Sequence, residues 1–358
     1  MKFSYQWHRR LGWFFAPLLA LSALSGALLL WLQPLPTPAD SLPPPAQWAQ
    51  ALDLGVVALE RGHLVGTRVD LVELPRQAGQ PIRVHFAGGG QWAEIDARSG
   101  AVLASRSDGG AWQAQLLELH KHLLLDDIGI WVLRIVALVG LVLLAMGLRI
   151  WWRVHKLVAP SPWRRWHRRI GSLALLPLAL MLFSGFVLRS SELARSSLSA
   201  LAGGAPPPPP RATAPLPGAP RASLGQALLT ATAALPGAQP IRMYDDASGV
   251  LRVRLRSDEW HPNGLNQVYL RASDATLLRA TTWRELPLAA RYPNVIYPLH
   301  IGWLPGSNSA AAALAMRLLW TGFALSLAWL ALSGAVQRWR ASGARARLPQ
   351  PPRRARST

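Results

Sequence analysis

The sequence predicts an all-α membrane bundle of four transmembrane helices from two parallel repeats, with two small α+β units outside the membrane. Only 16% of the 358 residues are charged, and long apolar stretches recur along the chain. Each is about as long as the roughly 20 residues that a helix needs to cross a hydrocarbon core. In addition, a motif near the N-terminus returns in mid-chain, which is typical of an internal duplication.

Composition excludes several other classes. The chain has no cysteine, which excludes a disulfide-stapled module, a thiolate metal site and a cysteine nucleophile. The net charge of +20 would suggest nucleic acid on a soluble domain. Here the basic residues flank apolar stretches, so we expect a lipid bilayer and no nucleic acid as the partner.

Four stretches are long enough to span the bilayer. The first is too long for a signal peptide and no small-residue cleavage site follows it, so we expect a retained helix. Arg134 and Arg317 interrupt the second and fourth stretches, where a buried charge is costly. The apolar stretches are 11–32, 128–148, 170–188 and 310–336.

The charges predict an orientation. Residues 1–33, 149–169 and 338–358 carry 3, 7 and 7 Lys or Arg and no acidic residue, whereas all 18 acidic residues fall in 34–127 and 189–309. The positive-inside rule therefore places both termini in the cytoplasm and both long connections in the periplasm, as expected for a multi-pass protein of a bacterial inner membrane. The predicted segments are helix 1 within 1–33, an outside unit at 34–127, helix 2 at 128–152, a basic loop at 153–169, helix 3 at 170–189, a Pro-rich linker and second outside unit at 190–308, helix 4 at 309–337 and a basic tail at 338–358.

The duplication is visible in short motifs. Leu119-His120 precedes the second stretch as Leu299-His300 precedes the fourth. The other matches, at an offset of 159 residues, are Trp7-His8-Arg9-Arg10 with Trp166-His167-Arg168-Arg169 and Ser25-Gly26 with Ser184-Gly185. These matches predict parallel repeats related by an axis along the membrane normal. We expect the Ser-Gly pairs, including Ser333-Gly334, to serve close helix packing.

Each outside segment predicts a small α+β unit. Pro-rich segments at 33–45 and 203–220 precede the two units and are interpreted as extended linkers. Helical stretches follow at about 46–61 and 223–235. Alternating strand patterns then occur at 82–86 and 250–255. Gly88-Gly89-Gly90 is interpreted as a hairpin turn.

Four histidines occupy equivalent places in the two repeats. We expect His8 to face His167 at the cytoplasmic ends of the spans and His120 to face His300 at the outer ends. A pair of imidazoles from facing helices suits six-coordinate haem iron, so two haem groups are expected. The neighbouring Arg9 and Arg168 would bind the propionate groups of the haem. Arg134 and Arg317 are each expected to snorkel outward or to meet a haem propionate at the outer side.

Alternative readings stay open. A single interfacial histidine is more often an amphipathic anchor, and it is the matched duplication that favours ligation. Zinc or copper is disfavoured because a zinc site needs three or four close ligands. His122 is an alternative ligand to His120, and His155 in the basic loop is a second alternative.

These motifs, together with GLRIWWR at 147–153, LHIGWLPG at 299–306 and QRWR at 337–340, resemble the PepSY-associated transmembrane proteins, a group also described as iron-regulated membrane proteins. The strand–turn–strand pattern of 95–103 is similar to the end of a PepSY domain. The resemblance implies an inner-membrane haem protein, some members of which reduce ferric siderophores. It also implies haem b with His8, His167, His120 and His300 as axial ligands.

Three functions follow. The leading hypothesis is a di-haem oxidoreductase that takes electrons from an unidentified donor and reduces a periplasmic ferric siderophore or other ferric chelate. The alternative is a non-enzymatic, membrane-anchored PepSY module that binds a partner in iron uptake. Transport ranks last, because the spans carry no acidic residue for a cation path.

Overall fold

The computed structural model divides the chain into two compact units. The bundle unit comprises Met1–Leu28, Glu118–Arg189 and Trp320–Thr358, and the sheet unit comprises Leu29–Leu117 and Ser190–Leu319. The structure describes residues 2–33, 35, 42–62, 68–87, 91–106, 112–157, 161–204, 207–213, 220–245, 247–303 and 309–346. His63, the predicted Gly88-Gly89-Gly90 hairpin and parts of both Pro-rich linkers lie outside these residues.

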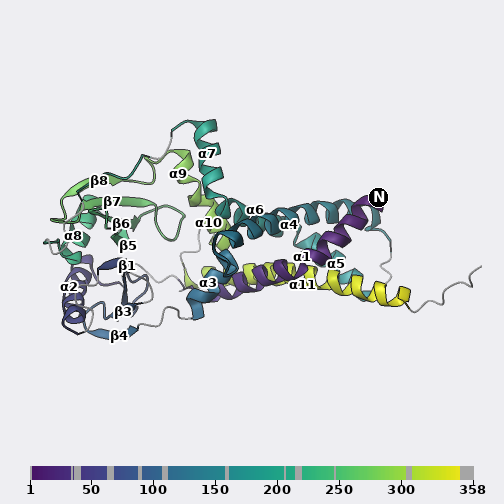
Figure 1. Ribbon diagram of the computed structural model, residues 1–358, viewed down its shortest axis with the longest axis horizontal. Helices are drawn as coiled ribbons and strands as arrows, with labels where there is room; N and C mark the ends of the chain where they lie inside the picture. The colour runs from purple at the N-terminus through teal and green to yellow at the C-terminus, as the bar shows by residue number, and fades with distance from the viewer. Residues whose placement is uncertain are drawn as a thin grey trace, which may run out of the picture. The chain divides into compact units, whose positions relative to one another are not determined.

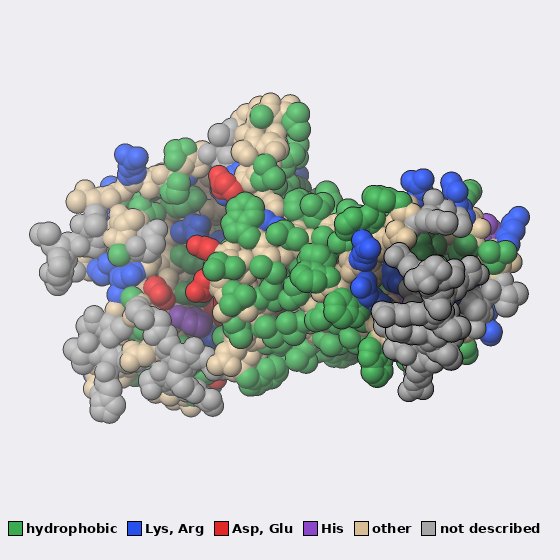
Figure 2. All heavy atoms as spheres, turned by 45° about the vertical axis from the view of Figure 1, so that its right-hand side comes forward, with side chains coloured by type: hydrophobic (Ala, Val, Ile, Leu, Met, Phe, Trp, Pro, Cys, Tyr) green, Lys and Arg blue, Asp and Glu red, His purple; other side chains and the backbone are tan. Residues whose placement is uncertain are grey.

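Three helices are long and apolar enough to cross a membrane: α1 (Lys2–Leu32), α4 (Asp126–Val154) and α11 (Ala310–Ala346). They coincide with the first, second and fourth predicted spans. Figure 2 shows hydrophobic side chains over the surface of the bundle helices and Lys and Arg side chains gathered toward one end. This distribution suits a multi-pass membrane protein.

The third predicted span, 170–189, is a bent pair of helices. α5 (Pro162–Leu173) and α6 (Leu175–Arg189) meet at a bend of 67°. Pro177 accounts for the break, because a proline has no N–H to donate to the carbonyl four residues earlier, at Leu173, and its ring crowds that carbonyl. The pair counts as a span only if both helices are taken together.

Small residues pack the centre of the bundle unit. Ala16, Ala20 and Ala23 of α1 meet Ala328 and Ala331 of α11 in one buried cluster. At Gly140 of α4, a Cβ atom would lie 2.9 Å from a Leu182 methyl group of α6. Close approach of the helix backbones therefore depends on residues without bulk, as is common between membrane helices.

The sheet unit contains one eight-stranded antiparallel sheet in the order β4-β3-β2-β1-β5-β6-β7-β8 (Figure 1). The strands are β1 (Val69–Glu73), β2 (Ile82–Phe86), β3 (Trp92–Ile95), β4 (Val102–Arg106), β5 (Gln239–Asp245), β6 (Val250–Arg256), β7 (Asn266–Arg271) and β8 (Leu277–Thr281). The expectation of two separate sheets is corrected here. The strands of each half are antiparallel as predicted, but β1 pairs with β5 and joins the halves.

Two helices cover one face of this sheet. α2 (Pro45–Gly62) and α8 (Leu224–Ala234) contribute Trp48, Leu52 and Leu228 to a core shared with Val84 and Val253 of the strands. The helices also contact each other, because Asp53 of α2 accepts a hydrogen bond from the N–H of Gly225 at 2.7 Å. The opposite face of the sheet is polar.

The remaining helices in the described part of the chain are α3 (Trp112–His122), α7 (Ser191–Ala202), α9 (Leu288–Arg291) and α10 (Pro293–Ile301). His120 lies near the end of α3, and His300 near the end of α10. Both histidines were expected just before the second and fourth spans, but no helix was predicted for them.

Candidate functional site

The structure brings His8 of α1 and His167 of α5 together. Their ring centroids are 6.4 Å apart and the ring planes are almost perpendicular, at 86°. Two imidazoles that ligate one metal ion from opposite sides, with metal–nitrogen bonds of about 2.0–2.1 Å, have centroids about 6–6.5 Å apart. The spacing of the two histidines therefore fits a shared metal ion.

A serine lies beside the ring of His167. Nδ1 of His167 lies 2.9 Å from Oγ of Ser333 on α11. The Ser333 hydroxyl is also 3.3 Å from the carbonyl of Leu330. When the hydroxyl donates to that carbonyl, its oxygen accepts from the Nδ1–H of the imidazole. Nε2 is then unprotonated, which is the form that a metal ion requires.

His120 is held in the same way. Its Nδ1 lies 3.0 Å from Oγ of Ser25, and that hydroxyl donates to the carbonyl of Leu21 at 2.8 Å. The ring also lies directly against Gly26, where a Cβ atom would come within 2.8 Å of Cε1 of His120. The pair Ser25-Gly26 of α1 therefore both orients the imidazole and makes room for it.

Glycines also adjoin the inner pair of rings. A Cβ atom at Gly147 of α4 would lie 3.5 Å from Cε1 of His8, and one at Gly334 of α11 would lie 3.7 Å from Cε1 of His167. Both glycines stand five residues before the Trp-Arg pairs at 152–153 and 339–340. His8 and His167 thus each have a glycine from an equivalent position of the repeats beside the ring. The absence of a side chain there leaves room for the imidazole.

His300 belongs to the sheet unit, where it is half-buried near the end of α10. His120 belongs to the bundle unit. The pairing of His120 with His300 stays a prediction.

The alternative ligands have local partners. His122 lies beside Glu118 of the same helix, with 3.7 Å between Nδ1 and Oε2. His155 stacks on Trp151, with ring centroids 5.0 Å apart, and its Nδ1 lies 2.9 Å from the carbonyl of Trp152. Neither contact brings a second histidine to the ring.

The arginines next to His167 and His8 make different contacts. Arg168 donates to the carbonyl of Val154, the last residue of α4, and to that of Leu157 just beyond it. The guanidinium of Arg9 lies over the ring of Tyr5, 6.0 Å from its centroid. A role of either residue in holding propionates stays a prediction.

Arg134 and Arg317 each bind the end of a helix from the other repeat. Arg134 of α4 donates to the carbonyl of Arg189 at 2.9 Å, and Arg317 of α11 donates to the carbonyl of Gln33 at 2.7 Å. These carbonyls lie at the C-terminal ends of α6 and α1, where the helix dipole attracts a cation. The exchange of arginines between repeats agrees with the predicted duplication.

The positions of Ser25, Ser333 and their glycines beside the histidines differ from the expectation. The Ser-Gly pairs were expected to serve helix packing, because small residues are common between membrane helices. The available signal was the repetition of Ser-Gly in both halves together with a matched set of histidines.

The donor set around His8 and His167 consists of two imidazoles. Within the described part of the chain, no three His, Asp or Glu side chains gather to hold a metal ion. A pair of neutral imidazoles leaves four further coordination positions to another ligand, as the four nitrogens of a porphyrin provide. The residues around His8 and His167 therefore fit haem.

Comparison with curated proteins gave no match. The family described as "PepSY-associated TM region" matches residues 5–341, nearly the whole chain. This protein belongs to the PepSY-associated transmembrane family.

Proposed function

We propose that this protein is a haem-binding membrane oxidoreductase that reduces a ferric chelate. The observation that carries the proposal is the pair His8–His167, with ring centroids 6.4 Å apart. The serine bound to Nδ1 of His167 supports it, because that contact leaves Nε2 free. His120 has a similar arrangement with Ser25 and is the proposed ligand at the other end of the bundle.

Haem bound at these histidines would supply a one-electron carrier. Ser333 and Ser25 would orient the imidazoles of His167 and His120, and the apolar helices around them would limit access of water. One electron weakens the bonds between iron and a chelator of hard oxygen atoms, so release of iron needs no acid–base residue. The donor of the electron is not specified by the site.

The proposed direction of transfer is from the cytoplasm to the periplasm of a bacterial cell. It rests on the positive-inside rule, since residues 1–33, 149–169 and 338–358 are basic and contain no acidic residue. Both termini and His8 with His167 would then be cytoplasmic. The sheet unit would be periplasmic.

The test is a stopped-flow experiment on the full chain purified in detergent. The protein is reduced with dithionite, freed of the excess and mixed with a ferric chelate. We expect the haem absorbance to return to the oxidised form while ferrous iron appears in equal amount. Retention of the reduced spectrum with every ferric chelate would contradict the proposed reaction.

The alternative is a membrane-anchored binding module without redox chemistry. It predicts a colourless protein in which His8→Ala and His120→Ala leave folding and partner binding unchanged. A haem spectrum that both substitutions alter would exclude this alternative.

A further inference from the structure

The face of the sheet opposite α2 and α8 is rich in arginine. Alternate residues of a strand point to the same face, and Val72, Val84 and Val253 point into the core against the helices. Their neighbours in the strands therefore point the other way. These are Arg83 of β2, Arg242 of β5, Arg252, Arg254 and Arg256 of β6, and Arg279 of β8.

The charges on this face are balanced in one half of the sheet and not in the other. In the first half, Arg83 lies 2.7 Å from Glu94 and 3.9 Å from Glu73. In the second half, Arg242 stands directly opposite Arg254 in the register of β5 and β6. Like charges placed opposite each other destabilise a sheet, so this pair needs an explanation.

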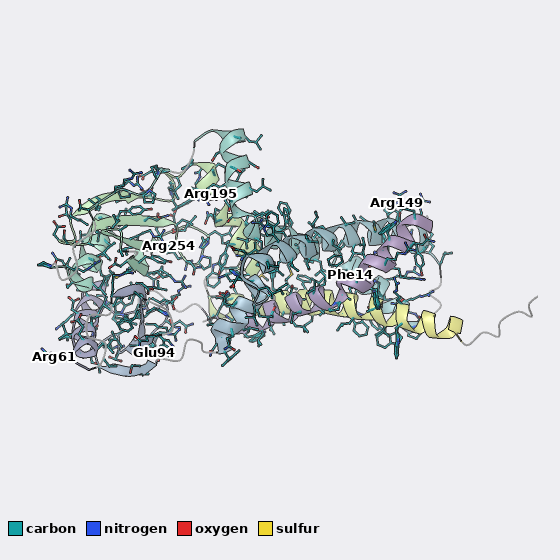
Figure 3. All side chains as sticks on the ribbon, in the orientation of Figure 1. Phe14, Arg61, Glu94, Arg149, Arg195 and Arg254 are labelled. Carbon is teal, nitrogen blue, oxygen red and sulfur yellow. The ribbon has the colours of Figure 1, made fainter. Side chains whose placement is uncertain are left out.

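The arginines of the second half have more aromatic and neutral partners than carboxylate partners: Tyr244 hydrogen-bonds Arg242 and Arg254, and Arg256 lies over the ring of Trp303. Arg242 forms an ion pair with Glu73, Arg254 donates to the carbonyl of Gly264, and Arg252 lies 4.3 Å from the centroid of the Tyr244 ring. The buried Nε atoms of Arg242, Arg254 and Arg256 make no hydrogen bond within the described residues. Figure 3 labels Arg254 on its strand. Buried donors without an acceptor need an explanation, and the oxygens of an anionic ligand would supply the missing acceptors.

Arg76, in the loop after β1, adds to this charge. We call Arg76, Arg242, Arg252, Arg254 and Arg256 the arginine face. Burial lowers the pKa of Arg76, Arg254 and Arg256, and nearby arginines lower the pKa of the first two further.

Two carboxylates lie near the arginine face. Glu73 is shared among Arg242, Arg83 and His85. Glu259 accepts hydrogen bonds from the backbone of Ser257 and Leu265. Five arginines thus face two carboxylates that are already engaged.

The dimensions suit a small molecule with several acidic groups. Alternate residues of β6 are about 6.5–7 Å apart, so its three arginines extend over about 13 Å. Planar guanidinium groups bind carboxylates in a bidentate manner. The face continues toward a cavity of about 290 Å³, lined among others by Arg279, Arg195 and Tyr269.

We propose that the arginine face binds an anionic polycarboxylate chelate of ferric iron, of the citrate type. This identification of the substrate class rests on the proposed function. The binding site itself does not, because an excess of guanidinium groups over carboxylates attracts a polycarboxylate whether or not the iron is reduced. Neutral and cationic chelates are disfavoured on this surface.

The experiment measures binding to the full chain in detergent by calorimetry, with gallium(III) citrate as a redox-inert probe. Ferric tris(acetohydroxamate), which is neutral, is the comparison ligand. The variants are Arg242→Gln and Arg254→Gln, with Arg61→Gln as the matched control. Arg61 is exposed on α2, which covers the other face of the sheet.

We expect gallium citrate to bind and each face variant to weaken binding about tenfold or more. Arg61→Gln should bind as the unmodified protein does, and binding to the unmodified protein should weaken as salt increases. Because Arg242→Gln also removes the ion pair with Glu73, Arg254→Lys serves as a second variant. It keeps the charge without the planar fork and should bind more weakly than the unmodified protein.

Equal binding of the neutral hydroxamate complex, or equal weakening by Arg61→Gln, would overturn the proposal. Binding only to vesicles of anionic lipid and not to gallium citrate would also overturn it. Citrate binding that depends on Arg254 in a protein without haem would keep the arginine face and reject the reductase.

Discussion

Ser333 and Ser25 each lie within hydrogen-bond distance of the Nδ1 atom of a histidine, and each hydroxyl also lies near a backbone carbonyl of its own helix. Replacement of Ser333 by alanine releases Nδ1 of His167 and the ring's fixed orientation. Loss of such a partner typically lowers the affinity for a metal about 10–100-fold. We therefore expect Ser333→Ala to lose haem more readily and to change its redox midpoint potential, measured by spectroelectrochemistry.

Ser326→Ala is the matched control. Ser326 lies on the same helix, and its hydroxyl donates to the carbonyl of Gly322. It should retain the haem and the potential of the unmodified protein. Identical potentials for Ser333→Ala and Ser326→Ala would show that Ser333 has no role at the histidine.

Gly26 is expected to tolerate no side chain. A Cβ atom there would lie 2.8 Å from Cε1 of His120, so Gly26→Ala must displace the ring. Gly322→Ala is the control, because nothing lies within 4 Å of its Cβ position and alanine stabilises a helix by up to about 1 kcal/mol relative to glycine.

We expect Gly26→Ala to lower the melting temperature and to alter the spectrum of one haem. Gly322→Ala should leave the spectrum unchanged and the melting temperature equal or higher. Both are measured by thermal scanning of the purified protein with absorbance detection.

At this scale the sequence indicated the histidines but not their supports. His8 and His167 stood out because the same four-residue motif occurs twice. Ser25 and Ser333 did not, because their partners lie on other helices, far away in the chain. Which helix faces which histidine depends on tertiary packing.

Among the elements, the ends of α1 and α6 depend on arginines from other helices. Arg134→Gln removes the cation that binds the carbonyl of Arg189. An interaction of this kind with a helix C-terminus contributes about 1 kcal/mol. We expect the melting temperature to fall by about 2–4 °C.

Arg149→Gln tests whether loss of charge alone has this effect. Arg149 is an exposed residue of the same helix and is labelled in Figure 3. It should melt as the unmodified protein does. A fall of equal size in both variants would contradict the assigned role of Arg134.

The elements themselves were largely predictable, but their breaks and edges were not. Pro17 lies within the continuous helix α1, whereas Pro177 follows the break between α5 and α6. Proline alone therefore does not predict a bend. The alternation of apolar and polar residues predicted the two faces of each strand. The pairing of β1 with β5 depends on which strand edges meet, and the alternation does not specify this.

For the whole molecule, we expect the stability of the folded chain to decrease at acidic pH because of two groups in the sheet unit. Burial and nearby arginines lower the pKa of His261 to about 3. Burial raises the pKa of Glu73, but His85 and Arg242 outweigh it and bring that pKa to about 2. In both cases the unfolded chain binds a proton that the folded chain does not, so stability falls as pH decreases.

The loss attributed to His261 should begin near pH 6.5, and that attributed to Glu73 near pH 4.5. His261→Gln should therefore show a flatter dependence of melting temperature on pH between 6.5 and 4.5. An unchanged slope in this range would show that His261 is not responsible.

The haem content of the purified full chain tests the central claim most directly. It is measured by the pyridine haemochrome assay for the unmodified protein, His167→Ala and the control His155→Ala. We predict about two haem b groups per chain in the unmodified protein and in His155→Ala, and loss of one in His167→Ala. A chain that folds without haem, or a content that His167→Ala does not reduce, would contradict the account.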